Sequence, residues 1–548
     1  MTSRKEEKPG KTGAGRWALR PDVRARVVPL VLLNLVALLL IGNFLNSHLK
    51  NFGGDDIHFL LLAEALARGA GFVNLHLPGL PIHTHYPPLY PALLAPLLAA
   101  GAPLVVLKAW TAVLGMAGFN LAYLFLVPVR GRTLALLAVL GAMLSESFLD
   151  VGLHCMSDGP YLLFSFAALL FVRRTFAQPG PWTWNAVLAG AFTGLSVLLR
   201  TVGVVFAPAI AIYALVARAP GLALRSRITR LAVVGAVTLA FSTPWLATLA
   251  LKGGPVSYVV ELTNTNQATG AAAEAVPGGM LRRPVANVIV LAKDADSTDM
   301  RPVLRPIYLV LFAATTILVI AGLARGIAVR RDVGAIYVVV YVVVMMAWVP
   351  SGFRLLMPLF PLLLSALCDG LELLARGTAQ ARAARTRRVA AAWLAGIMVV
   401  ELAVMQFAPL VNQRLHGHEA QWWREYLRAV CTLGTIADPG AIVVSQPDVL
   451  PYYLTGLQSP PLRGKRPDMR QAILDSGAKY VILSPNLRNR RAFTTAVREA
   501  PERFRSIAKI GDIEVFAIVD PATPMDWQPA AVRPYSPRCQ QVLTYEAD

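Results

Sequence analysis

Two adjacent carboxylates, Asp55 and Asp56, are the first residues whose type and position favour catalysis. They belong to the sequence Gly-Gly-Asp-Asp-Ile-His at residues 53–58, which follows an apolar stretch. Burial beside a membrane and a like-charged neighbour both raise a carboxyl pKa towards the range of a general base. His58 is a candidate for substrate binding in the same cluster. A solvated Gly-Asp turn after a helix explains these residues equally well.

A second polar cluster, residues 83–91, reads His-Thr-His-Tyr-Pro-Pro-Leu-Tyr-Pro. The paired prolines predict an extended segment that leads into a short helix. His83 and His85 alternate along the chain, so in a strand they would share a face, where they could bind a divalent metal. Two histidines at this spacing are a weak metal signal. We expect packing or substrate hydrogen bonding from His85 and Tyr86 instead.

Asp158 lies between two apolar runs, where a charge tends to be functional or to pair with a functional group. It also precedes Pro160 and a predicted helix, as an N-cap would. Both roles are compatible.

Two arginines, Arg200 and Arg354, depart from the cytoplasmic pattern of the other basic residues, because each lies at the outer end of a predicted hairpin. A guanidinium group at a membrane surface is suited to hold a phosphate bidentately. The alternative for each is a side chain that only extends to the interface.

The composition assigns the chain to the membrane proteins. Of 548 residues, 55% are hydrophobic and 15% are charged, against about a quarter charged in soluble proteins. The net charge of +20 would suggest nucleic acid in a soluble protein. Here the basic residues lie between apolar runs, a pattern typical of cytoplasmic loops against anionic lipid, and no nucleic-acid-binding motif is present. The bilayer is therefore a partner and nucleic acid is not.

Hydropathy and charge predict a polytopic α-helical membrane protein with about eleven spans. Residues 89–101 are too short and too rich in proline to cross a bilayer, so we expect a juxtamembrane or re-entrant helix there. With that choice, the basic tail 1–26 and every arginine-rich loop lie in the cytoplasm. The predicted spans are residues 27–45, 105–127, 134–148, 161–172, 184–199, 202–217, 231–250, 307–323, 333–349, 355–374 and 389–410.

The chain divides into a transmembrane domain, residues 27–410, with outer loops at 46–104 and 251–303, and a polar segment, residues 411–548. The polar segment predicts a small soluble extracytoplasmic α/β domain, because Val- and Ile-rich strands alternate with short helices. The expected strands are 441–445, 479–483 and 514–519, and the expected helices are 422–436, 468–475 and 490–500.

Cys431 and Cys539 both fall in this polar segment. They could pair if the segment lies in an oxidising compartment. The four cysteines show no CxxC spacing, which argues against a zinc site or a redox pair. For Cys431 and Cys539 we expect two unpaired thiols.

These features together resemble the GT-C superfamily of membrane glycosyltransferases, and especially bacterial dolichyl-phosphate-mannose protein mannosyltransferases and aminoarabinose transferases. The acidic pair after the first span, the Tyr-Pro-Pro-Leu-Tyr-Pro sequence at 86–91 and Ser157-Asp158 resemble motifs of that superfamily. Arg354 followed by Pro358 and Pro361 resembles its arginine-containing hairpin, and Tyr452 to Gly456 and Ala478 to Val481 also look familial.

The resemblance implies transfer of a sugar from a polyprenyl-phosphate carrier to an extracytoplasmic glycolipid, cell-wall glycan or protein, with inversion at the sugar. On this hypothesis Asp55 is the general base, Arg354 and Arg200 hold the carrier phosphate, and Asp158 orients the acceptor or stabilises charge on the sugar. No cofactor is certain, and a divalent metal is possible. The protein would be a multi-pass plasma-membrane enzyme with a cytoplasmic N-terminus. The alternatives are a flippase or transporter of lipid-linked sugars, which should show repeated broken helices, and a non-catalytic envelope scaffold.

Overall fold

The structure is a computed structural model. It describes residues 21–46, 49, 55–177, 182–217, 222–252, 305–347, 353–374, 379–400, 421–462, 468–484, 490–520 and 532–544. Residues 253–303 of the predicted loop 251–303 and most of the tail 1–26 therefore lie outside the described residues.

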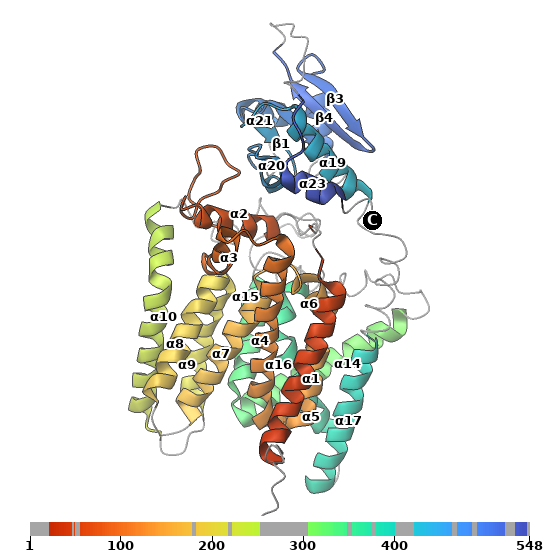
Figure 1. Cartoon of the computed structure of the whole chain (residues 1–548). Coiled ribbons are helices and arrows are strands. Elements are labelled where there is room, and N and C mark those ends of the chain that lie inside the picture. Colours follow the sequence, from red (N-terminus) through yellow and green to blue (C-terminus); the bar gives the residue numbers. More distant parts are fainter. Residues whose placement is uncertain are drawn as a thin grey trace, which may run out of the picture.

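A bundle of long helices forms the larger part of the molecule (Figure 1). Within the described residues, six helices are long and apolar enough to cross a membrane. The chain is a multi-pass membrane protein, and each predicted span overlaps a helix of the bundle; the total of eleven spans stays a prediction. The bundle helices are α1 Pro21–Phe44, α4 Leu104–Arg130, α5 Arg132–Met143, α7 Asp158–Ala177, α8 Thr183–Leu199, α9 Phe206–Val216, α10 Leu224–Lys252, α14 Arg305–Arg325, α15 Val333–Ala347, α16 Phe360–Leu374 and α17 Ala379–Val400.

Short helices gather at one end of this bundle. They include α2, Asp55–Ala67, and α3, Leu89–Ala99, which lie across the top of the long helices in Figure 1. At 1.5 Å per residue, the 11 residues of α3 extend about 16 Å, which is half of a hydrocarbon core of about 30 Å. The remaining short elements at this end are α6 Glu146–Val151, η1 Thr201–Val205 and η4 Phe353–Leu359, whereas η3 Gly326–Arg330 lies at the opposite end.

The end of the bundle opposite α2 collects arginines. Arg130, the last residue of α4, donates to Asp369 on α16 at 2.7 Å. Arg330 pairs with the same carboxylate at 2.7 Å and with Glu372 at 2.9 Å, and Arg325 pairs with Glu372 at 3.0 Å. These arginines come from loops that the charge pattern assigns to one side of the membrane, and the structure places them together.

Glycines bring α4 and α7 into close contact. A Cβ atom on Gly118 would lie 2.7 Å from the backbone nitrogen of Leu163, and one on Gly159 would lie 3.4 Å from the Cα atom of Gly115. Small residues at helix interfaces allow this approach in membranes, where packing rather than water exclusion drives association. The contact fixes the start of α7, where Asp158 lies.

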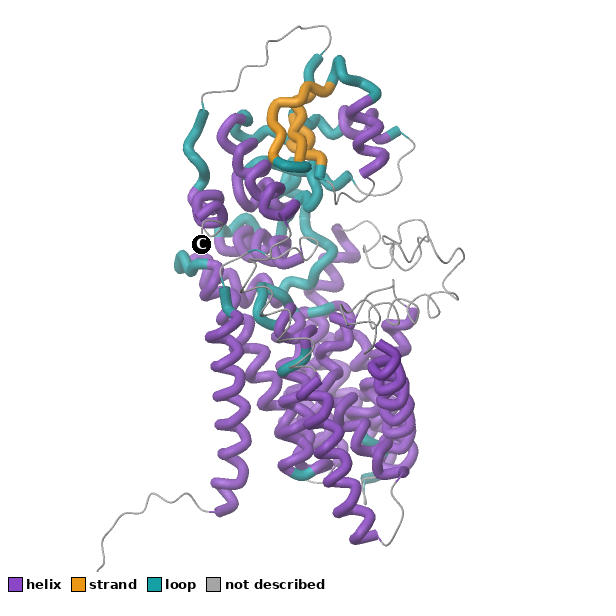
Figure 2. The backbone as a smooth tube through the Cα atoms, turned by 90° about the vertical axis from the view of Figure 1, so that its right-hand side faces the viewer, coloured by secondary structure: helices purple, strands orange, loops and turns teal. Residues whose placement is uncertain are grey.

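Residues 421–544 contain a four-stranded sheet in the order β1-β2-β4-β3, above the bundle in Figure 1. The strands are β1 Val443–Val444, β2 Tyr480–Leu483, β3 Phe504–Ile510 and β4 Ile513–Ile518, and Figure 2 shows them in orange. β1 and β2 are parallel, and the other pairs are antiparallel. The helices of this part are α19 Gln421–Ile436, α20 Val449–Thr455, α21 Met469–Asp475, α22 Arg490–Arg498 and α23 Pro537–Thr544.

Alternation along the strands gives this sheet two apolar faces. Tyr480 and Ile482 pack in one core with α19 and α20, whereas Val481 and Leu483 pack in another with α21 and α22. Helices therefore cover both faces, as the period of two in a strand requires when both sides are apolar.

Helix α2 is shared by the two parts of the molecule. Phe59 and Ala63 belong to the core of the bundle, and Ile57 and Leu61, on another face of α2, belong to the core that contains α19 and α20. Ten of its thirteen residues are buried, so both partners determine its position.

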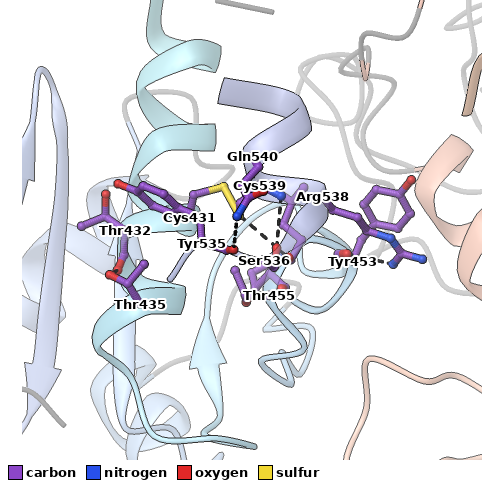
Figure 3. The surroundings of a disulfide bond; sticks show 12 residues. Cys431, Thr432, Thr435, Tyr453, Thr455, Tyr535, Ser536, Arg538, Cys539 and Gln540 are labelled. Atoms are coloured by element: carbon purple, nitrogen blue, oxygen red, sulfur yellow. Dashed lines mark hydrogen bonds between the residues drawn. A yellow bond between two sulfur atoms is a disulfide. The ribbon is translucent and has the colours of Figure 1, made fainter. Parts of the chain in front are cut away.

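Cys431 and Cys539 form a disulfide, so the expectation of unpaired thiols is wrong (Figure 3). The expectation failed because it did not include α23. This helix places Cys539 beside α19, with 5.6 Å between the two Cα atoms across a sequence separation of 108 residues. Cys155 and Cys368 are buried free thiols.

Replacing Cys431 and Cys539 with alanine should lower the stability of the C-terminal part by about 2–4 kcal/mol, because the disulfide closes a long loop of the unfolded chain. Denaturant unfolding followed by the fluorescence of Trp422 and Trp423 measures this change. A double Cys155→Ala and Cys368→Ala variant controls for the loss of thiols as such. Equal stability with and without the disulfide would contradict the expectation.

Candidate active site

The first turn of α2 places Asp55 between two donors from distant parts of the chain. The Tyr86 hydroxyl donates to Oδ1 at 2.7 Å, and Arg354 Nη1 donates to Oδ2 at 3.0 Å. Arg354 lies 299 residues from Asp55 in the sequence. Both carboxylate oxygens are therefore held in place.

Arg354 and Arg200 share a second carboxylate, that of Asp158. Arg354 Nη2 lies 3.5 Å from Asp158 Oδ2, and Arg200 forms an ion pair with Oδ1. The order Asp55, Arg354, Asp158, Arg200 alternates in sign, and we call these four residues the charge chain. Each predicted residue of the charge chain comes from a different loop, and the structure brings all four together.

Local structure fixes each arginine. Arg200 interrupts two helices, since its extended backbone ends α8 before η1 begins, and its guanidinium group lies 6.0 Å from the ring centre of Tyr161. Arg354 lies in η4, whose Leu355 carbonyl accepts a hydrogen bond from the Tyr341 hydroxyl at 2.8 Å. Tyr341 was not predicted; a tyrosine in an apolar span is a weak signal for a role of this kind.

Exposure differs along the charge chain. Asp158 is fully buried, whereas the side chains of Asp55 and Arg354 are 31% and 29% exposed. Within the described part of the chain, Arg354 Nε has no hydrogen-bond acceptor. Arg354 therefore offers a buried N–H group to a bound ligand, next to an accessible carboxylate.

Asp55 and Asp56 have opposite electrostatic environments. Burial raises the pKa of Asp55, but Arg354 and the hydrogen bond from Tyr86 outweigh it and hold that pKa below its usual value. Burial raises the pKa of Asp56 to about 7, against the Ile57 backbone N–H, which donates to it. Asp55 is thus a carboxylate at neutral pH, and Asp56 titrates near neutrality.

Lys108 lies near Asp56, and sequence reasoning missed it. It is 2% exposed on α4, its ammonium group donates to Asn46 at 3.1 Å, and its charge lowers the pKa of Asp56. A single lysine inside a predicted span is costly to bury. That cost was the signal that could have identified it.

The histidines of the two clusters surround Tyr86. The His83 ring stacks on the Tyr86 ring, and the His58 and His85 rings lie within 6 Å of it between centroids. His83 Nε2 accepts from the Tyr86 backbone N–H, so Nδ1 carries the proton and donates to Asn74 Oδ1 at 2.6 Å. Burial lowers the pKa of His83, in agreement with a neutral ring.

The described residues do not fit a metal ion. None of their His, Cys, Asp and Glu side chains form a group of three or more that could hold one. Both nitrogens of His83 and both oxygens of Asp55 already have partners. His83 therefore positions Tyr86, and no step below involves a metal.

The comparisons agree with this architecture. The sequence model of the dolichyl-phosphate-mannose-protein mannosyltransferase family matches residues 85–247. No curated protein matches the sequence. The crystal structure of apo ArnT from Cupriavidus metallidurans is 14% identical and has a TM-score of 0.56, with 90% of this chain and 98% of that chain covered.

Two further structures extend the likeness. ArnT from the same organism bound to undecaprenyl phosphate gives a TM-score of 0.50 at 15% identity over 90% of this chain and 99% of that one. The oligosaccharyltransferase AglB from Archaeoglobus fulgidus, in complex with an inhibitory peptide and a dolichol-phosphate, gives 0.56 at 15% identity over 94% and 76%. The chain has the fold of GT-C glycosyltransferases. At these identities, the likeness concerns the fold alone.

Within this GT-C fold, Asp158→Asn should destabilise the protein far more than Asp55→Asn. The first change leaves two guanidinium groups around a neutral amide in a buried site, which costs about 3–5 kcal/mol. The second removes a partly exposed carboxylate and leaves Arg354 paired with Asp158, which costs about 1 kcal/mol or less. Unfolding midpoints of the purified variants in one detergent measure the difference, and equal midpoints would contradict it.

Proposed function

We propose that this protein is an inverting glycosyltransferase that moves a sugar from a polyprenyl-phosphate carrier to a hydroxyl group outside the cytoplasm. One observation carries the proposal: the charge chain, with an accessible carboxylate and an accessible guanidinium group, lies at the α2 end of a GT-C bundle. The acceptor is a glycan, a lipid or a protein.

The two arginines are suited to the carrier phosphate. Guanidinium groups bind phosphate bidentately, and Arg354 has an N–H group without an acceptor in the described residues. The structures of ArnT with undecaprenyl phosphate and of AglB with a dolichol-phosphate support the choice of carrier. A sugar donor whose phosphate is carried by a membrane lipid needs no nucleotide-binding fold.

Asp55 acts as the general base. Its carboxylate takes the proton of the acceptor hydroxyl, whose oxygen forms a bond to the anomeric carbon while the bond from that carbon to the phosphate oxygen breaks. The leaving phosphate keeps the electron pair, and Arg354, with Arg200 behind it, stabilises the added negative charge. One displacement inverts the anomeric centre.

Asp158 serves as a positioning residue. Its complete burial and its contacts with both arginines favour this role over direct contact with an acceptor. His58, His85 and Tyr86 remain candidates for substrate binding around Asp55, and Tyr86 also fixes the carboxylate.

Two observations support an orientation in the membrane. The disulfide of the C-terminal part favours an oxidising compartment, and the arginine-rich end of the bundle favours the cytoplasm. The charge chain lies at the other end, so the reaction would occur on the outer face of the plasma membrane, with the N-terminus inside.

Asp55→Asn should abolish transfer, with a loss of at least about a hundredfold in rate, because the acceptor proton loses its base. The assay incubates purified protein with a panel of labelled polyprenyl-phosphate sugars and membrane extract, and follows label that leaves the carrier. The matched control is Asp438→Asn, which removes an exposed carboxylate whose one ion pair among the described residues is with Lys479, at 2.9 Å.

Full activity of a folded Asp55→Asn variant would rule out the base assignment. If label leaves none of the donors although the wild-type protein is folded, the result would favour a transporter of lipid-linked sugars. Movement of donor across liposomes would then be the next measurement.

The pH dependence of kcat/KM distinguishes the two carboxylates. If Asp55 is the base, its lowered pKa keeps it deprotonated, and the profile stays flat from about pH 8 to about pH 5. If Asp56 is the base, kcat/KM falls tenfold per unit below about pH 7. Tyr86→Phe removes a hydrogen bond that lowers the pKa of Asp55. In this variant kcat/KM should therefore begin to fall at a higher pH, on acidification, than in the wild type.

A further inference from the structure

A cavity lies apart from the charge chain, between α2 and the C-terminal part. Its volume is about 360 Å³. One wall is Glu64 of α2 and Arg68, the residue that follows α2, and the other is residues 452–456 together with residues 536–538. The cavity joins the helix that carries Asp55 to the helix that the disulfide holds.

Arg538 is fixed in this cavity by three contacts. Nη1 donates to the Tyr453 carbonyl at 2.9 Å, the guanidinium group lies 4.3 Å from the centre of the Tyr453 ring, and Nη2 lies 3.1 Å from Glu64 Oε2. Figure 3 shows Arg538 beside Tyr453, next to the disulfide at Cys539. The side chain is nevertheless 35% exposed, so an oriented guanidinium group faces the cavity with donors to spare.

The charges of the cavity do not balance. Glu64 pairs with both Arg538 and Arg68, so two guanidinium groups face a single carboxylate. Glu64 is 11% exposed and Arg68 is 57% exposed, which leaves the positive groups accessible and the negative one covered. An anion entering the cavity meets two arginines held by one buried carboxylate.

The cavity and the candidate active site share helix α2. Glu64 follows Asp55 by nine residues, which is about 13 Å along the helix axis and two and a half turns around it. The two side chains therefore project from opposite sides of α2, and a molecule that contacts both has to extend along the helix and around it.

We infer that this cavity binds a phosphate or carboxylate group of the sugar acceptor, and that Arg68 and Arg538 recognise it. The acceptor is then an anionic glycan. That the bound group belongs to a sugar acceptor rests on the proposed function, but anion binding in the cavity can be tested without any transfer reaction.

The test measures binding of N-acetylglucosamine 1-phosphate to the full-length protein in detergent by saturation-transfer NMR, with N-acetylglucosamine as the uncharged match. Wild type should bind the phosphorylated sugar more tightly than the neutral one. Arg68→Gln should weaken that binding at least about tenfold, because it removes a charged hydrogen-bond donor. Arg68 pairs with Glu64, four residues earlier in the same segment, so this variant leaves the ion pair between the two parts intact, whereas Arg538→Gln removes it. Arg505→Gln, on the exposed side of β3, is the matched control and should bind as wild type does.

Equal binding of the two sugars, or equal binding by wild type and Arg68→Gln, would overturn the inference. Vesicles of phosphatidylglycerol in phosphatidylcholine provide the third arm. If they bind through Arg68 and the phosphorylated sugar does not, the cavity takes a lipid headgroup and the acceptor assignment is wrong. Failure of the transfer assay with intact, Arg68-dependent binding of the phosphorylated sugar would instead count against the proposed function alone.

Discussion

The structure depends on pairing four charges at the edge of a membrane. An isolated carboxylate or guanidinium group in this environment would be very costly, and alternation of sign along Asp55, Arg354, Asp158 and Arg200 removes most of that cost. Because the four residues come from separate loops, the ends of α2, α7, α8 and η4 must meet at one point. Close contact between α4 and α7 through Gly118 and Gly159 provides part of the precision that this requires.

The two carboxylates of the charge chain differ in exposure, and this difference fits them for different roles. Asp158 is buried and has two arginines to hold, whereas Asp55 is at the accessible end and has a lowered pKa. A buried carboxylate is costly unless it is paired, and Asp158 has both arginines as partners. A carboxylate that takes a proton from a substrate must be accessible to that substrate. Asp56, the next residue in the chain, is buried, and burial raises its pKa to about 7.

Much of the bundle could be predicted because the bilayer imposes length and polarity on every span, and the short, proline-rich segment that became α3 was recognised by the same criterion. Three of the four strands lie where Val and Ile runs placed them. β3 was missed because it is an edge strand whose Arg505 and Lys509 face solvent and hide its apolar pattern. The four residues of the charge chain were predicted singly. Their pairing, and the disulfide, join positions up to hundreds of residues apart, which no local spacing encodes.

Helix α2 acquires its last contacts late in the life of the chain. Glu64 and its partner Arg538 are separated by 474 residues. At translation rates of about 5–20 residues per second, roughly 25–95 s pass between their synthesis. During that interval the face of α2 with Ile57 and Leu61 has no C-terminal part to pack against. The helix that bears the candidate base is thus among the first elements to be made and among the last to gain all of its packing contacts.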